Sequence, residues 1–305
     1  MNAVLLFFLA LGASGGDEKA AADGPWALSD PALYQDFPDL CLDRNGTPWI
    51  AYVRHDGTSD TVRLARKGAQ GIEDVAALSE PGVVHQPAIA CDGSGALWIF
   101  WGQLGPRNIV RLCARSVRDG KPAAVDVISD SEGSDTFADA GTDAAGRVWV
   151  VWQSMRRGTA DVFTRYYDPK DARWSREIAV TPDETGNWEP RVAFDGKDGA
   201  WIVYDSSRGD EFNVYAARVG LDGKVVTKTV TRSPEYEARV SVAPTAARRS
   251  GSRSNAGGSA GARTCAPTTA PMGSMARSGS CWGGSTWRPE RSRKRRRRRP
   301  SWRLW

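Results

Sequence analysis

The sequence predicts an all-β fold, a β-propeller made of four-stranded antiparallel blades. Three observations predict it. One motif is repeated four times at a nearly constant interval, the stretches between the copies are short apolar runs separated by turn residues, and no stretch keeps a helical period. Self-similarity at a period of about 50 residues is the signature of stacked supersecondary units.

The repeated motif has the form PxxxxDxxxxxWxx[WY]. Its copies begin near Pro38, Pro87, Ala138 and Pro190, and a fifth begins at Ala238. In each complete copy an aspartate precedes a tryptophan by six residues, and a second aromatic follows three residues later. The aspartates are Asp43, Asp92, Asp143 and Asp195, and the tryptophans are Trp49, Trp98, Trp149 and Trp201.

Each period divides into four strands, which in the third copy are residues 138–142, 148–153, 161–167 and 175–181. The second strands LWIFW and AWIVY are apolar at consecutive positions, so they are buried on both faces. Blades that pack face to face bury their strands in this way. We therefore expect the repeat tryptophans to lie between blades.

The two ends of the repeat region also fit a propeller. Residues 26–29 align with the fourth strand of a blade, as if they completed the last blade of a ring. Residues 238–242 align with the first strand of a fifth blade. The repeats therefore define a partial propeller over residues 26–243.

An apolar run from Ala3 to Leu11, followed by small residues, opens the chain. The run is short for a membrane span and typical of a secretory signal peptide. We predict a signal peptide at residues 1–15, a linker at residues 16–25, and a secreted or periplasmic protein without a membrane span. The alternative is a buried strand or an uncleaved anchor.

On the four motif copies, the region resembles secreted bacterial β-propellers, with the Tol-B-like and sialidase-like propellers nearest in pattern. The aspartate lies farther from its aromatic than in a sialidase Asp-box, and neither the paired glycines of kelch blades nor the Trp-Asp dipeptide of WD40 blades is present. The resemblance implies the fold. It also makes a sialidase-like glycan-processing enzyme the alternative function.

The last 62 residues differ in kind from the rest. Residues 1–243 hold 26 Lys and Arg against 35 Asp and Glu, whereas residues 244–305 hold 15 against 1 and lack Val, Ile, Phe, Tyr and Asp. Such a segment cannot bury a core, and we predict that it is disordered. Because it interrupts a repeat, and because its composition is that of GC-rich DNA read out of frame, we interpret it as a frameshifted translation.

The segment RSRKRRRRRP offers a rival interpretation of this tail. Clustered Lys and Arg neutralise phosphates and release counterions, so the tail could bind nucleic acid or act as a targeting signal. That function conflicts with a signal peptide, and it holds only if the tail is translated in frame.

The repeated aspartates are predicted to cap the first turn of each blade through bonds to backbone N–H groups. Calcium at the DGKDG loop of Asp195 is the alternative, although no copy has the full acidic ladder of a calcium loop. We expect neither a metal nor a cofactor. Cys41, Cys91 and Cys113 form an odd set without metal spacing, which leaves a disulfide open but unassigned.

The functional candidates lie in loops at one end of the blades, since loops on a rigid scaffold carry function disproportionately. An arginine recurs in the loop between the second and third strands of every blade. A ring of guanidinium groups could bind carboxylates or phosphates in a bidentate manner, and solvated loop pairs are the alternative. The candidate ligand-binding residues are Arg54, Arg107, Arg156, Arg208, Trp188, Glu189 and Tyr236.

These features favour an extracytoplasmic recognition or scaffold module that binds an acidic small molecule, a glycan or a protein on its loop face. No catalytic residue is assigned. In the sialidase-like alternative, convergent arginines would hold a substrate carboxylate beside acid and nucleophile groups.

Overall fold

The computed structural model describes residues 5–6, 26–27 and 33–242, except residues 70, 130, 183–184 and 209–210. All of them belong to one compact unit. Of the predicted signal peptide only β1 (Leu5–Leu6) is described, and it pairs with β2 (Trp26–Ala27). The rest of the signal peptide, the linker at residues 16–25 and the tail at residues 244–305 lie outside the described residues.

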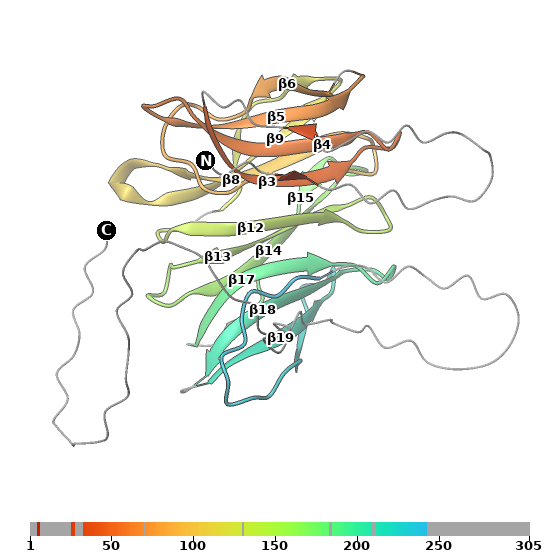
Figure 1. The fold of residues 1–305 in the computed structure, drawn as a ribbon. Coiled ribbons are helices and arrows are strands. Elements are labelled where there is room, and N and C mark those ends of the chain that lie inside the picture. Colours follow the sequence, from red (N-terminus) through yellow and green to blue (C-terminus); the bar gives the residue numbers. More distant parts are fainter. Residues whose placement is uncertain are drawn as a thin grey trace, which may run out of the picture. The chain divides into compact units, whose positions relative to one another are not determined.

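Four antiparallel sheets follow one another along the chain (Figure 1), and each corresponds to one predicted blade. In blade 1 the strands are β3 (Tyr34–Leu42), β4 (Pro48–His55), β5 (Asp60–Gly68) and β6 (Gly71–Ala77). In blade 2 they are β7 (Ala88–Cys91), β8 (Leu97–Leu104), β9 (Val110–Arg118), β10 (Lys121–Pro122) and β11 (Asp126–Val127), with the 3-10 helix η1 (Pro106–Asn108) between β8 and β9.

The other two blades have the same strand order. Blade 3 comprises β12 (Asp135–Thr142), β13 (Val148–Ser154), β14 (Asp161–Asp168), β15 (Arg173–Trp174) and β16 (Ile178–Ala179). Blade 4 comprises β17 (Gly186–Ala193), β18 (Ala200–Arg208), β19 (Glu211–Val219) and β20 (Val225–Thr229). The prediction of an all-β, propeller-like fold is therefore confirmed.

Three predicted strands differ from the structure. The strand expected at residues 175–181 is instead two short pieces, β15 and β16, which both pair with β14. Residues 26–29 were expected to complete a distant blade, but Trp26–Ala27 pairs with β1. Residues 238–242 form no strand, because the described chain supplies no second strand of a fifth sheet for them to pair with.

The two aromatics of the motif point to opposite faces of each sheet, as a three-residue separation on a strand requires. Trp149 packs in the core between blades 3 and 4, and Trp152, on the same strand, packs in the core between blades 2 and 3. Trp98 and Trp101 repeat this arrangement one blade earlier. One short motif thus fills two successive interfaces, which explains the consecutive apolar positions of the second strands.

The fixed spacing of aspartate and tryptophan has a structural cause in the turn between the first two strands. Asp143 Oδ1 accepts hydrogen bonds from the backbone N–H groups of Ala145 and Arg147, and its Oδ2 accepts one from Trp149 Nε1 at 3.0 Å. The tryptophan bond recurs at 3.1, 3.1 and 3.0 Å for the aspartates of blades 1, 2 and 4. This side-chain bond, which the repeat pattern alone does not predict, joins the turn to the core tryptophan.

Half-buried aspartates on the innermost strands link neighbouring blades. Asp39 on β3 accepts a hydrogen bond from the backbone N–H of Ile89 in blade 2 at 2.8 Å, and Asp139 on β12 accepts one from Val192 in blade 4 at 2.7 Å. A β-bulge precedes each of these aspartates in the register of its strand. The bulges are built around left-handed residues, Phe37 and Phe137, with φ of 51° and 53°.

Blades 2 and 3 also touch through their first turns, where the N–H of Gly93 donates to the carbonyl of Gly146 at 2.8 Å. A Cβ at position 146 would lie 2.5 Å from Gly93 Cα, and Gly146 has φ of +85°. Gly46 occupies the same turn position in blade 1 with φ of +78°, but nothing lies within 4 Å of a Cβ there. Alanine substitutions at the two glycines therefore share the cost of a positive φ, and only the one at position 146 adds a clash between blades.

We predict that Gly146→Ala lowers the free energy of unfolding by about 1–2 kcal/mol more than Gly46→Ala does, since overpacking adds to the shared cost of a positive φ. Urea titration of both variants measures the difference. Equal destabilisation would mean that the contact with Gly93 contributes nothing.

Beyond blade 4 the chain lies against that blade's last face. Val240 is buried and packs on Val203, Val214 and Ala216, and the N–H of Arg239 donates to Asp205 Oδ1 at 3.3 Å. Trp201, on this face, is only half-buried, unlike the other three repeat tryptophans. Among the described residues no helix is long and apolar enough to cross a membrane.

Candidate functional site

A stack of three aromatic rings lies at the loop end of blade 4. The Trp188 and Phe212 rings stack with centroids 5.3 Å apart and planes 22° apart, and Phe212 contacts Tyr236 at 4.8 Å. Trp188 and Phe212 come from β17 and β19, which both begin at this end of the blade. Tyr236 follows β20 and is held by its neighbour Glu237, whose N–H donates to the carbonyl of Phe212 at 3.1 Å.

The stack is supported at one end and open at the other. A Cβ on Gly186 would lie 1.9 Å from the Trp188 ring, so the indole rests directly on the glycine backbone. Tyr236, at the opposite end, is 73% exposed. The stack therefore presents the Tyr236 ring to solvent beside two half-buried rings, which is how a protein holds an amphipathic group that makes contact with a ligand.

Carboxylates accompany the stack. Asp205 is opposite Trp188 in the β17–β18 register and is only 3% exposed. Burial, together with the charge of Glu189, raises the pKa of Asp205 to about 6. Glu189 lies in the bulge of β17 with φ of 46°, and Glu237 Oε2 is buried without a hydrogen-bond partner among the described residues. The region thus combines an aromatic surface with three carboxyl groups.

The predicted arginines are spread over four blades, and most are engaged by acids or rings. Arg54 pairs with Asp74 at 3.2 Å, and Arg208 lies 4.2 Å above the Tyr215 ring. Arg107 is exposed in η1.

Arg156 is the most engaged of the predicted arginines. It pairs with Glu177 at 2.5 Å and lies 3.8 Å above the Phe163 ring, while its Nε donates to Ser154 Oγ at 2.9 Å. These contacts match the alternative of loop pairs. The structure gathers Trp188, Glu189 and Tyr236 at the loop end of blade 4, whereas the four arginines lie on four different blades.

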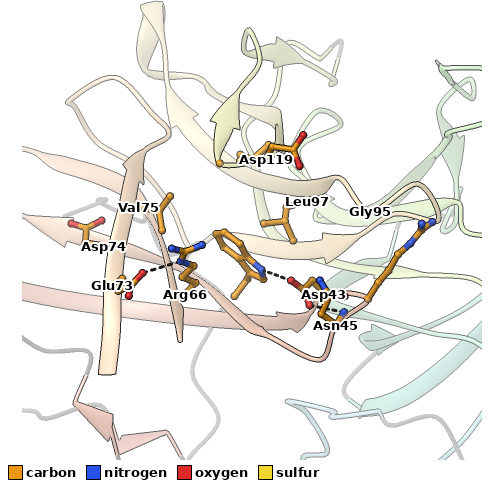
Figure 2. A pocket seen from close by; sticks show the side chains of 13 residues that line it. Asp43, Asn45, Arg66, Glu73, Asp74, Val75, Gly95, Leu97 and Asp119 are labelled. Atoms are coloured by element: carbon orange, nitrogen blue, oxygen red, sulfur yellow. Dashed lines mark hydrogen bonds and ion pairs between the residues drawn. The ribbon is translucent and has the colours of Figure 1, made fainter. Parts of the chain in front are cut away.

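A separate pocket of about 640 Å³ opens between blades 1 and 2 at the opposite end of the blades, beside the first turns (Figure 2). Several polar side chains that line it are paired with one another. Arg66 pairs with Glu73 at 2.9 Å, and Asp43 accepts the indole N–H of Trp49. Arg44 and Asp119, at the rim, carry opposite charges. The pocket shows no surface comparable to the aromatic stack, so it is the weaker candidate.

Phe212 and Asp205 are site residues that the sequence analysis missed. Both depart from the repeat at aligned positions. Phe212 corresponds to Asp60 in blade 1 and Ala160 in blade 3, and Asp205 corresponds to Gln153 in blade 3. The available signal was a residue specific to one blade at the loop end of a strand, which a motif of shared residues does not contain.

No protein-family model and no curated protein matches this sequence. Among solved structures the chain is similar to a protein of unknown function from Dyadobacter fermentans DSM 18053, with a TM-score of 0.50, 14% identity, and coverage of 66% of this chain and 70% of that one. The chain is also similar to an ulvan lyase of polysaccharide lyase family PL25, bound to -[GlcA(1-4)Rha3S]-. The TM-score is 0.50 and the identity 13%, with coverage of 66% of this chain and 59% of the lyase.

A Hadza microbial sialidase, Hz136, gives a TM-score of 0.46 at 13% identity, with coverage of 60% of this chain and 44% of the sialidase. The chain therefore spans less than two thirds of the sialidase and of the lyase. At these identities the similarities concern the fold alone, and those at a TM-score of 0.50 agree with the class defined above, a β-propeller-like protein.

Proposed function

We propose that this protein is an extracytoplasmic recognition module that binds a glycan on the loop end of blade 4. The observation that carries the proposal is the Trp188–Phe212–Tyr236 stack with its exposed outer ring. An exposed, supported aromatic ring stacks against the apolar face of a pyranose, and nearby carboxylates accept bonds from sugar hydroxyl groups. The secreted or periplasmic location is part of the proposal and rests on the apolar N-terminal run.

Tyr236 should dominate binding, because it is the most exposed ring of the stack. We expect Tyr236→Ala to weaken glycan binding at least about tenfold, a loss within the range for an aromatic anchor. The matched control is Tyr34→Ala, since Tyr34 is also exposed (62%) and lies at the start of the first strand of blade 1, where its hydroxyl donates to Asp36 Oδ2 at 3.3 Å. Calorimetry against a panel of neutral and acidic oligosaccharides measures both variants.

Binding that survives in Tyr236→Ala, or a panel without any bound member, would contradict the proposed site. The acidic members of the panel test the predicted arginine ligands as well. If acidic sugars bind and Arg156→Ala or Arg208→Ala abolishes that binding, the arginine loops form the site in place of the stack.

A second candidate function is glycan processing, which the carboxyl pair of Asp205 and Glu189 favours. A carboxyl with a pKa of about 6 beside a second carboxylate can serve as the acid of a glycoside-cleaving pair. Release of new reducing ends from the same panel, abolished by Asp205→Asn, would establish it. Binding without release would leave the recognition function alone.

A further inference from the structure

All three described cysteines lie in one core, between blades 1 and 2. Cys113 is buried within it on β9, and Cys41 and Cys91 are half-buried at its edge. All three are free thiols here. They come from three different strands, so the fold brings them into one core although they are far apart in the sequence.

Two of these thiols lie on neighbouring innermost strands, Cys41 on β3 and Cys91 on β7. Cys41 is opposite Trp49 in the register of blade 1, and Cys91 is opposite Leu97 in the register of blade 2. Trp49 and Leu97 both belong to the shared core, so each cysteine side chain points toward the other blade. Both cysteines also sit at the same end of their innermost strands, just before the first turns.

Cys113 is placed differently. It is opposite Trp101 on the third strand of blade 2, farther from the turn end, and it is 5% exposed. A small oxidant reaches half-buried Cys41 and Cys91 before it reaches this position. Cys113 therefore serves as an internal control in the same core.

We propose that Cys41 and Cys91 form a disulfide that joins the innermost strands of blades 1 and 2 when the protein meets an oxidising disulfide such as oxidised glutathione. One protein thiolate attacks the glutathione disulfide, which forms a mixed disulfide and releases one glutathione thiol. The second protein thiolate attacks the protein sulfur of that mixed disulfide and releases the second glutathione thiol. Two protein thiols are oxidised, and one glutathione disulfide is reduced.

The bond would close a loop that contains β4, β5 and β6 of blade 1. A cross-link of about 50 residues limits the unfolded chain and raises thermal stability, on the order of 5–10 °C in Tm for a domain of this size. Burial raises the pKa of both thiols, so the exchange should be slow at neutral pH and faster near pH 9.

The test uses the full chain with Cys265→Ser and Cys281→Ser, incubated with oxidised glutathione at pH 8.5 and then digested with trypsin under non-reducing conditions. Trypsin separates the three cysteines, because Arg44, Lys67 and Arg111 lie between them. We expect a linked pair of the Cys41 and Cys91 peptides, a free Cys113 peptide, and a rise in Tm that reductant reverses. Cys113→Ser should keep the rise in Tm, and Cys41→Ser or Cys91→Ser should each abolish it.

A linked peptide containing Cys113, glutathione adducts on both Cys41 and Cys91, or two unmodified thiols would each overturn the proposal. The peptide result comes from protein with all three core cysteines, so it stands even if a serine variant fails to fold.

Discussion

Replacing Trp149 with alanine should lower the free energy of unfolding by about 3–5 kcal/mol, the range found for emptying an aromatic core site. Trp149 is fully buried, and its ring contacts Tyr166 at a centroid distance of 4.8 Å. It fills the core between blades 3 and 4, and its indole N–H is bonded to the buried Asp143. The substitution removes both the packing and the bond that holds the turn.

The matched control is Trp201→Ala, since Trp201 keeps the same bond to its aspartate at 3.0 Å but is only half-buried. We expect about half the loss, because less apolar surface returns to water. Urea unfolding followed by circular dichroism measures both variants. If the two midpoints fall together, burial between blades does not decide the contribution of the repeat tryptophans.

Trp149→Phe separates packing from the hydrogen bond. Phenylalanine keeps most of the buried ring but leaves Asp143 Oδ2 with one donor fewer, and Arg147 Nε, at 2.6 Å, still reaches that oxygen. We therefore expect a loss well below that of the alanine variant, on the order of 1–2 kcal/mol. A loss equal to that of alanine would assign the effect to the bond.

The sheets could be predicted because each blade repeats one pattern, and a pattern read four times outweighs the ambiguity of any single apolar run. The Trp149 motif marks a turn and a doubly buried strand in a few residues. The outer strands were harder to predict from the sequence. β15 and β16 hold two residues each, and a ladder of two residues leaves no period in the sequence.

The aromatic stack could be predicted only in part, for a different reason. Trp188, Phe212 and Tyr236 are each separated by 24 residues in the sequence. They meet because β17 and β19 both start at the loop end, and because the N–H of Glu237 binds the carbonyl of Phe212. Chain order indicated the correct end of the blade, but the individual contact follows from one backbone bond that no sequence pattern records.

The same reasoning limits what the arginines could show. Their recurrence between the second and third strands of each blade indicates only that they lie at one end of the blades. Whether a guanidinium is paired depends on the acids beside it. Asp74 lies on β6 and Glu177 lies between β15 and β16, and the repeat does not fix the position of these outer segments. Charge pairing across a blade therefore follows from the three-dimensional structure.

Asp205→Asn should make the protein more stable than the parent at pH 8 and leave it nearly unchanged at pH 4. Burial, and then the charge of Glu189, raises the pKa of Asp205 to about 6 in the folded protein from an ordinary value of 3.8. The folded state therefore holds this proton more tightly than the unfolded state does. The resulting stabilisation is complete below about pH 3.8 and is lost as the pH rises through about 6.

At pH 8 the ionised, buried carboxylate should lower the free energy of unfolding by up to about 3 kcal/mol relative to its protonated form. Asparagine removes the charge and keeps an oxygen that can accept the N–H of Arg239, which Asp205 Oδ1 accepts at 3.3 Å. Urea titrations of parent and variant at pH 4, 6 and 8 measure the effect, and a constant difference between the two proteins would contradict it.

Gln153→Glu supplies the reciprocal variant, because Gln153 holds the aligned position in blade 3 and accepts the N–H of Glu189 at 3.3 Å. A carboxyl there should create a loss of stability with rising pH of the same sign.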